Sequence, residues 1–393
     1  MRTRFWLLAG VVVVIAAAVP AAEEAGDPFA FFDPSVKVTA RDRARLDRDE
    51  VIVQSLPADD GHLAVFAATR LNAPPEVLLA WTRAIEAFKK GFQVVRVGRF
   101  SDPVADSDLD ALVLENDELD ALRKCRVGTC ELKLGAAEIA EIQDATRAAG
   151  KGWREAAQHA FRRVLIARVR LHRQRGLLAL PPYADRSRRM SVGEAFSAIV
   201  ARSPYLTRAL PDVVNSLLAP PPDAGVADES FYYWSHDSYG AGRPIVTVTY
   251  VRLLRRNDPG VPLTMTISTQ LFASHYTEGA LGLTAVTCDD ARTACYLVYL
   301  NRTQVDFLGG FFGAFKRSAI ERRIESETPE LLRDVRQRLE SDAPDNDDGP
   351  RPRTDSFARD ARFSALLQRP VSGSIPSPRV YRDGPRHGTC GVV

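Results

Sequence analysis

The chain has 393 residues, of which 45% are hydrophobic, and carries 52 lysines and arginines against 50 aspartates and glutamates. This balance argues against nucleic acid as the main partner, because nucleic-acid-binding proteins usually concentrate a positive excess. The hydrophobic share is sufficient for a sizeable core, in one elaborated domain or in two smaller ones.

Residues 1–22 have the pattern of a secretory signal peptide. Two arginines precede an apolar run over residues 5–19, and the small residues at 19–21 match a cleavage pattern. The apolar stretch lies at the lower limit for crossing a bilayer, so retention as an anchor is the alternative. We expect a periplasmic or secreted protein of a bacterial cell envelope, with no transmembrane span after cleavage.

Residues 23–48 are mixed and charged, and we expect an N-terminal linker there. Residues 49–101 follow as the first part of a folded domain. Turn residues and apolar patterning predict strands at 51–56 and 62–71, a helix at 75–90 and a third strand at 92–100.

Residues 102–225 change to helical patterns interrupted by prolines, which predicts a helical insertion. The second part of the domain, 226–340, returns to alternating patterns and ends in a long helix. Its predicted strands cover residues 231–236, 245–254, 263–275, 281–288 and 295–301. Residues 341–393 are rich in Pro, Asp, Arg and Gly and predict a disordered tail.

The chain has five cysteines, and four of them form two closely spaced pairs. Cys125 and Cys130 flank one turn-like segment, and Cys288 and Cys295 flank another. Two local disulfides are the economical interpretation in an oxidising compartment, with Cys390 left over. A zinc site from the four thiolates is the alternative, but neither pair has C-x2-C spacing, so no metal is expected.

Common catalytic and cofactor motifs are absent from the sequence. It contains no G-x-S-x-G elbow, no H-E-x-x-H, no P-loop and no dinucleotide fingerprint, so no cofactor is expected. The three residue types of a Ser-His-Asp catalytic triad occur together at 235–237. Neighbouring residues on a strand point to alternate faces, so these three cannot form a catalytic relay.

Four residues are candidates for binding a ligand. Tyr233 and Trp234 belong to a dense aromatic stretch, which either lines a mixed cavity or packs in a core. Counting by two from Leu263 along its strand places His275 on the buried side, with Tyr276 beside it. The alternative for His275 is a histidine that is hydrogen-bonded near the end of the strand.

The order of elements resembles the START-related helix-grip (SRPBCC) superfamily over residues 49–101 and 226–340. "LNAPPEVLLAW" introduces the first helix, and a run of strands and a long helix follow. The resemblance implies an α+β fold in which a curved antiparallel sheet wraps the long C-terminal helix. It also implies a cavity for a lipid, sterol, polyketide or other hydrophobic ligand, but it transfers no active site, and the block at 102–225 departs from the compact family plan.

We therefore expect an exported protein that binds a hydrophobic small molecule or lipid between the sheet and the last helix. One alternative is a cell-envelope interaction protein with a filled core, whose insertion or tail engages a partner protein. Another is an enzyme of the cyclase or hydratase kind, with His275 as acid or base. The sequence favours a protein without catalytic activity over an enzyme.

Overall fold

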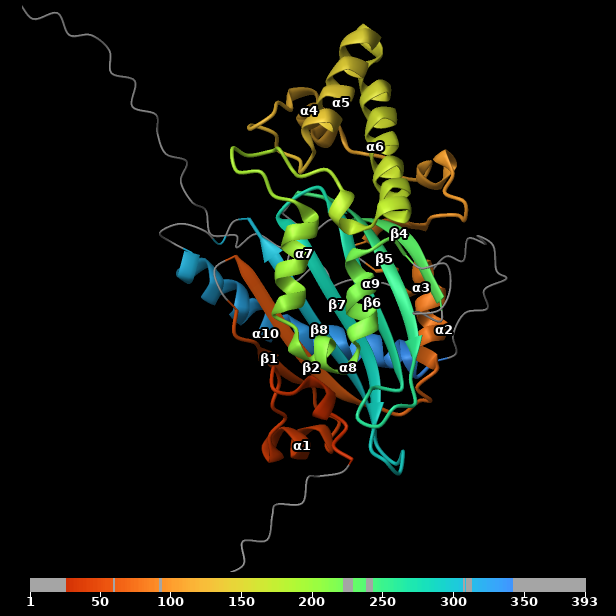
Figure 1. The fold of residues 1–393 in the computed structure, drawn as a ribbon, viewed down its shortest axis with the longest axis vertical. Helices are drawn as coiled ribbons and strands as arrows, with labels where there is room; N and C mark the ends of the chain where they lie inside the picture. The colour runs from red at the N-terminus through yellow and green to blue at the C-terminus, as the bar shows by residue number, and fades with distance from the viewer. Residues whose placement is uncertain are drawn as a thin grey trace, which may run out of the picture.

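A computed structural model describes residues 26–58, 61–91, 94–221, 229–237, 243–306, 308 and 313–341. The predicted signal peptide, the tail from residue 342 onward and Cys390 lie outside the described residues. The described chain combines helices with one eight-stranded antiparallel sheet, which confirms the α+β class (Figure 1). None of the described helices has the length and apolar character that a bilayer crossing requires.

The strands form one sheet in the order β1-β2-β8-β7-β6-β5-β4-β3, and each pair of neighbours is antiparallel. Because β8 returns to pair with β2, residues on either side of the insertion share one sheet. In chain order the strands are β1 (Ile52–Ser55), β2 (His62–Leu71), β3 (Val94–Arg99), β4 (Glu229–Asp237), β5 (Ile245–Arg255), β6 (Thr264–Ala273), β7 (Thr277–Cys288) and β8 (Cys295–Val305).

Helices cover both faces of the sheet, with α7 and α9 in front of it and α10 behind it in Figure 1. The helices α4 to α9 belong to the segment between β3 and β4. The α-helices are α1 (Ala40–Leu46), α2 (Val77–Arg83), α3 (Ile85–Phe88), α4 (Asn116–Lys124), α5 (Ala136–Ala149), α6 (Trp153–Arg175), α7 (Val192–Ala201), α8 (Pro204–Ala209), α9 (Pro211–Leu218) and α10 (Gly313–Leu339).

Each strand sends alternate side chains to two separate cores. On the insertion face, Trp234, Ile267 and Phe272 belong to a large apolar cluster with α5, α6 and α7. On the opposite face, α10 packs against β2 and β8 through residues such as Ile324 and Leu332. The sheet is therefore buried on both sides, although only the insertion face is apolar along its whole centre.

The segment from Gly26 to Arg48, part of the expected linker, is folded onto the insertion-face core. Phe29, Phe31 and Phe32 are each at most 3% exposed, and the ring of Phe32 lies 5.6 Å from that of Phe66. The linker expectation is wrong for these residues. Charged neighbours dominate the composition, but three aromatic side chains supply enough apolar area to dock the segment.

The predicted helix at 75–90 forms as two short helices, α2 and α3. Ala84 separates them because its backbone (φ −86°, ψ 46°) leaves the helical region. The apolar pattern over residues 75–90 gave no sign of this break, because α2 and α3 both present apolar residues to the sheet.

Both predicted disulfides are present. Cys125 and Cys130 close the loop after α4, and Cys288 and Cys295 join the ends of β7 and β8, where they are also register partners. Each bond cross-links the two ends of a turn, and the two turns lie far apart in the sequence. They are compatible with a protein of an oxidising, extracellular or periplasmic compartment.

The pairing predicts one free thiol. Titration of the denatured, non-reduced protein with DTNB after purification from an exporting host should report one thiol, from Cys390, and five after reduction. A Cys390→Ser variant should report none before reduction. Five thiols in the non-reduced protein would contradict both pairings.

Candidate functional site

A pocket lies on the α10 side of the sheet, over its centre, and we name it the sheet pocket. Its described lining encloses about 80 Å³. The side chains come from the strands β4 to β8: Tyr233, Thr247, Thr249, Ser268, Gln270, Ala280, Gly282, Thr284, Tyr299, Asn301 and Thr303. Most of them carry a hydroxyl or an amide.

The alternation along each strand produces this lining. On β8, Val298 and Leu300 point into the insertion-face core, whereas Tyr299 and Asn301 line the sheet pocket. Elsewhere the α10 face of the sheet is mostly apolar, with Val65 of β2 in the core that α10 joins, although Thr69 and Thr264 are bonded there to Arg336 and to the carbonyl of Pro75. Polar side chains are therefore concentrated in the middle of the face.

Some of the polar groups in the sheet pocket satisfy one another. Thr303 Oγ1 donates to Asn301 Oδ1 at 2.6 Å, and Thr247 Oγ1 lies 2.9 Å from Ser235 Oγ. Gln270 Nε2 donates to Thr277 Oγ1 at 2.9 Å. These contacts hold the walls of the pocket in place.

Other polar groups in the sheet pocket are left open. The hydroxyls of Thr249, Ser268 and Thr284 enter no side-chain hydrogen bond with another described residue. Burial raises the pKa of Tyr299, so its phenol stays protonated near neutral pH. The described lining thus offers neutral donors and acceptors, and no charge, to a molecule in the pocket.

The structure separates the two aromatic candidates. Tyr233 lines the sheet pocket, and Lys89 Nζ lies 5.4 Å from the centre of its ring. Trp234 faces the insertion, is fully buried, and donates from Nε1 to the carbonyl of Asp108 at 2.9 Å. A Cβ at Gly98 would lie 2.7 Å from that nitrogen, so the indole requires glycine on the adjacent strand. Trp234 is a core residue.

The serine, histidine and aspartate at 235–237 do not form a catalytic relay. Ser235 Oγ donates to Asp237 Oδ2 at 3.0 Å on the α10 side. His236 lies on the other face, where its Nε2 is 3.2 Å from Oε1 of Glu118 in α4. The alternation of neighbours along β4 therefore separates the histidine from the serine, as the sequence predicts.

His275 lies in the connection between β6 and β7, outside the strand and outside the lining of the sheet pocket. Counting from Leu263 predicts a buried side chain, and His275 is buried, but it does not lie on the strand, because the β5–β6 register shifts between Val248 and Thr249 and β6 ends at Ala273. A one-residue shift reverses which face a side chain takes. Sequence counting cannot detect such a shift.

The connection is tightly turned, and it buries the imidazole. Tyr276 has a φ of 65°, and Thr277 N donates to the carbonyl of His275 at 2.8 Å. The imidazole is 7% exposed, and its Nδ1 lies 2.8 Å from Ser274 Oγ. Its ring centre is 5.8 Å from that of Tyr276. The two residues are neighbours, but neither lines the sheet pocket.

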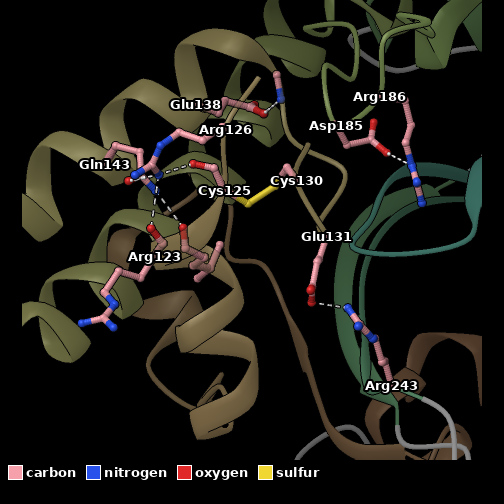
Figure 2. Close-up of a disulfide and its surroundings, with 12 residues drawn as sticks. Arg123, Cys125, Arg126, Cys130, Glu131, Glu138, Gln143, Asp185, Arg186 and Arg243 are labelled. Carbon is pink, nitrogen blue, oxygen red and sulfur yellow. Dashed lines mark hydrogen bonds and ion pairs between the residues drawn. A yellow bond between two sulfur atoms is a disulfide. The ribbon is translucent and has the colours of Figure 1, made fainter. Parts of the chain in front are cut away.

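Charged residues missed in the sequence surround this connection. Lys133 Nζ lies 2.8 Å from Asp306 Oδ2 and 3.7 Å from Asp185 Oδ2, and its side chain is only 4% exposed. Figure 2 shows Glu131 reaching across to Arg243. These partners come from the insertion and from strand ends, so no local spacing links them. Within the described ranges, no group of three or more His, Cys, Asp or Glu residues forms a metal site.

Burial lowers the pKa of His275 to about 4, and the positive charges of Arg243 and Lys133 act in the same direction. Glu118 and Glu131 oppose them. The imidazole is therefore neutral at pH 7 and serves as a hydrogen-bonding group in the folded protein.

Comparison of this chain with protein-family models, with curated proteins and with solved structures found no match. The function is therefore inferred from the sheet pocket and from the charges and contacts around it.

The lowered pKa predicts acid sensitivity. The unfolded chain binds a proton at His275 near pH 6.5, whereas the folded chain binds it only near pH 4. The contribution of the neutral imidazole to the free energy of unfolding is therefore present above pH 6.5 and is lost as the pH falls toward 4. Between pH 7 and pH 5 the free energy of unfolding falls by about 2 kcal/mol for this reason. In urea unfolding, His275→Asn should lose about 2 kcal/mol less than the parent protein over that interval.

The control is His159→Asn, which changes an exposed histidine of α6. It should follow the parent protein at both pH values. If His275→Asn and the parent lose the same free energy of unfolding between pH 7 and pH 5, the lowered pKa is refuted.

Proposed function

We propose that this chain is a binding protein for a small molecule, held in the sheet pocket by hydrogen bonds to hydroxyl and amide groups. One observation carries the proposal. Five adjacent strands place polar side chains together in the centre of a sheet face whose surroundings are mostly apolar and covered by helices.

Packing alone gives no reason for this polarity. Thr249 is buried and Ser268 and Thr284 are partly buried, and all three line the pocket. On the insertion face the same strands carry a filled apolar core. The open hydroxyls of Thr249, Ser268 and Thr284 face the pocket, where a ligand can form hydrogen bonds with them.

The size and chemistry of the described lining support a particular ligand class. A cavity that holds one water has a volume of about 10–15 Å³, measured as the space open to a water-sized sphere. Pockets for drug-sized molecules span about 300–1,000 Å³. The 80 Å³ enclosed here fits a polar group of a few heavy atoms. We infer a ligand with hydroxyl, carbonyl or amide groups that face the sheet. The lipid or other hydrophobic ligand expected from the resemblance stays a prediction, and this lining does not favour it.

The final helix supports a binding role for the same face. Tyr299 lines the sheet pocket and also belongs to the core that α10 forms with β2 and β8. This position is consistent with a sheet that wraps the C-terminal helix, as the helix-grip resemblance implies, and we include that arrangement in the proposal. Export to the periplasm or outside the cell belongs to the proposal as well, supported by the disulfides.

The second candidate is an interaction protein of the cell envelope. The filled core between the insertion and the sheet favours it, because the helical insertion has a rigid base from which to present a surface. A cyclase or hydratase activity has less support, since His275 does not line the sheet pocket.

Filling the sheet pocket should abolish binding. A Cβ at Gly282 would lie 3.5 Å from Ser268 Cβ and 3.6 Å from Asn301 Nδ2, so the strand accepts a side chain there. Gly282→Leu then places a leucine in the cavity. Native mass spectrometry of the full chain from an exporting host should show a bound small molecule in the parent protein and none in the variant.

The matched control is Ala167→Leu, which adds a leucine at an exposed position of α6 and should retain the molecule. If no molecule co-purifies, thermal melting is measured against a panel of polyols, sugars, nucleosides and N-acetyl amino acids at millimolar concentration. The parent melting temperature should rise with at least one compound, and Gly282→Leu should show no rise. An unchanged melting temperature across the panel, with no co-purified molecule, would refute the proposal.

A further inference from the structure

The helical insertion carries a second pocket, which we name the arginine pocket. It lies between the end of α4, the Cys125–Cys130 loop, α5 and the start of α6, and its volume is about 470 Å³. Its lining consists of Arg123, Arg126, Val127, Ala136, Ile139, Ala140, Gln143, Thr146, Arg147, Gly150 and Trp153. None of these residues lines the sheet pocket.

Two guanidinium groups of the arginine pocket are held in place without an acidic partner. The guanidinium of Arg123 lies 4.5 Å from the centre of the Trp153 ring. Arg126 donates to Gln143 Oε1 at 2.7 Å and to the carbonyl of Cys125 at 2.6 Å, as Figure 2 shows. No carboxylate among the described residues lies within ion-pair distance of Arg123 or Arg126.

The acidic residues near the arginine pocket are already engaged by other arginines. Asp144 pairs with Arg147, which lies at the edge of the pocket, and Asp120 lies 3.5 Å from Arg154. Glu141 pairs with Arg163 at 3.1 Å, away from the lining. The positive charge of Arg123 and Arg126 is therefore not neutralised from within the described chain.

Apolar groups make up much of the rest of the lining. Ile139 and Trp153 are nearly buried, whereas Val127 is 53% exposed. A cleft with an apolar floor and a few convergent polar groups is the usual form of a small-molecule site, and its volume falls within the common range of about 300–1,000 Å³.

We propose that the arginine pocket binds a small apolar carboxylate, independently of the molecule in the sheet pocket. The planar guanidinium presents its N–H donors in a fork that matches a carboxylate. Trp153 and Gln143 hold these forks before a ligand arrives, which reduces the ordering cost of binding. The apolar body of the ligand lies on Val127 and Ile139. The disulfide fixes the loop that supplies Arg126 and Val127.

Isothermal titration calorimetry with 2-naphthoate tests this inference, with 2-naphthamide as the uncharged probe of equal shape. The full chain should bind the acid at least tenfold more tightly than the amide. Arg123→Gln and Arg126→Gln should each weaken naphthoate binding about tenfold or more, because each removes a charge-assisted contact.

Two further variants separate binding from folding. Val127→Glu introduces a negative charge at an exposed position of the lining and should also abolish naphthoate binding. Arg175→Gln removes an exposed arginine at the end of α6 and should leave the affinity unchanged. Equal affinity for acid and amide, no binding at 5 mM, or unchanged binding in Arg123→Gln and Val127→Glu would each overturn the inference. Gly282→Leu changes only the sheet pocket and should bind naphthoate like the parent protein. Naphthoate binding therefore tests the arginine pocket independently of the proposal for the sheet pocket.

Discussion

Burial of the sheet on both faces is the constraint on which the rest of the structure depends. Antiparallel sheets commonly leave one face in water, and alternation then separates polar from apolar residues. Here the insertion covers one face and α2, α3 and α10 cover part of the other. Polar side chains from five strands are concentrated in the sheet pocket, and on this concentration we base the proposed site.

Buried polar contacts fix how the insertion meets the sheet. Lys133 pairs with Asp306 just beyond β8, and Glu118 of α4 lies within hydrogen-bond distance of His236 of β4. Breaking the Lys133–Asp306 pair leaves an uncompensated buried charge, at a cost of about 3–5 kcal/mol, so this contact restricts the insertion to one position. His275 lies among these charges, which assigns it to the junction between the insertion and the sheet.

The two proposed sites differ in the chemistry that each offers. The sheet pocket presents neutral hydroxyls and amides from five strands, where the register of the sheet holds them rigidly. The arginine pocket presents two guanidinium groups that have no carboxylate partner among the described residues, over an apolar floor, on helices and a disulfide loop. We therefore expect a neutral polar ligand in the sheet pocket and an apolar anion in the arginine pocket. The helical insertion supplies the second of these proposed sites.

The sequence by itself determined what depends on neighbours along the chain: the strand positions and the two short disulfide loops. Tertiary structure alone decided the rest. β6 ends before His275 and leaves it in the connection to β7, and three aromatic residues pack the expected linker into the core. The sheet pocket exists only once non-local hydrogen bonds align five strands, because side chains from distant segments meet through the register of the sheet.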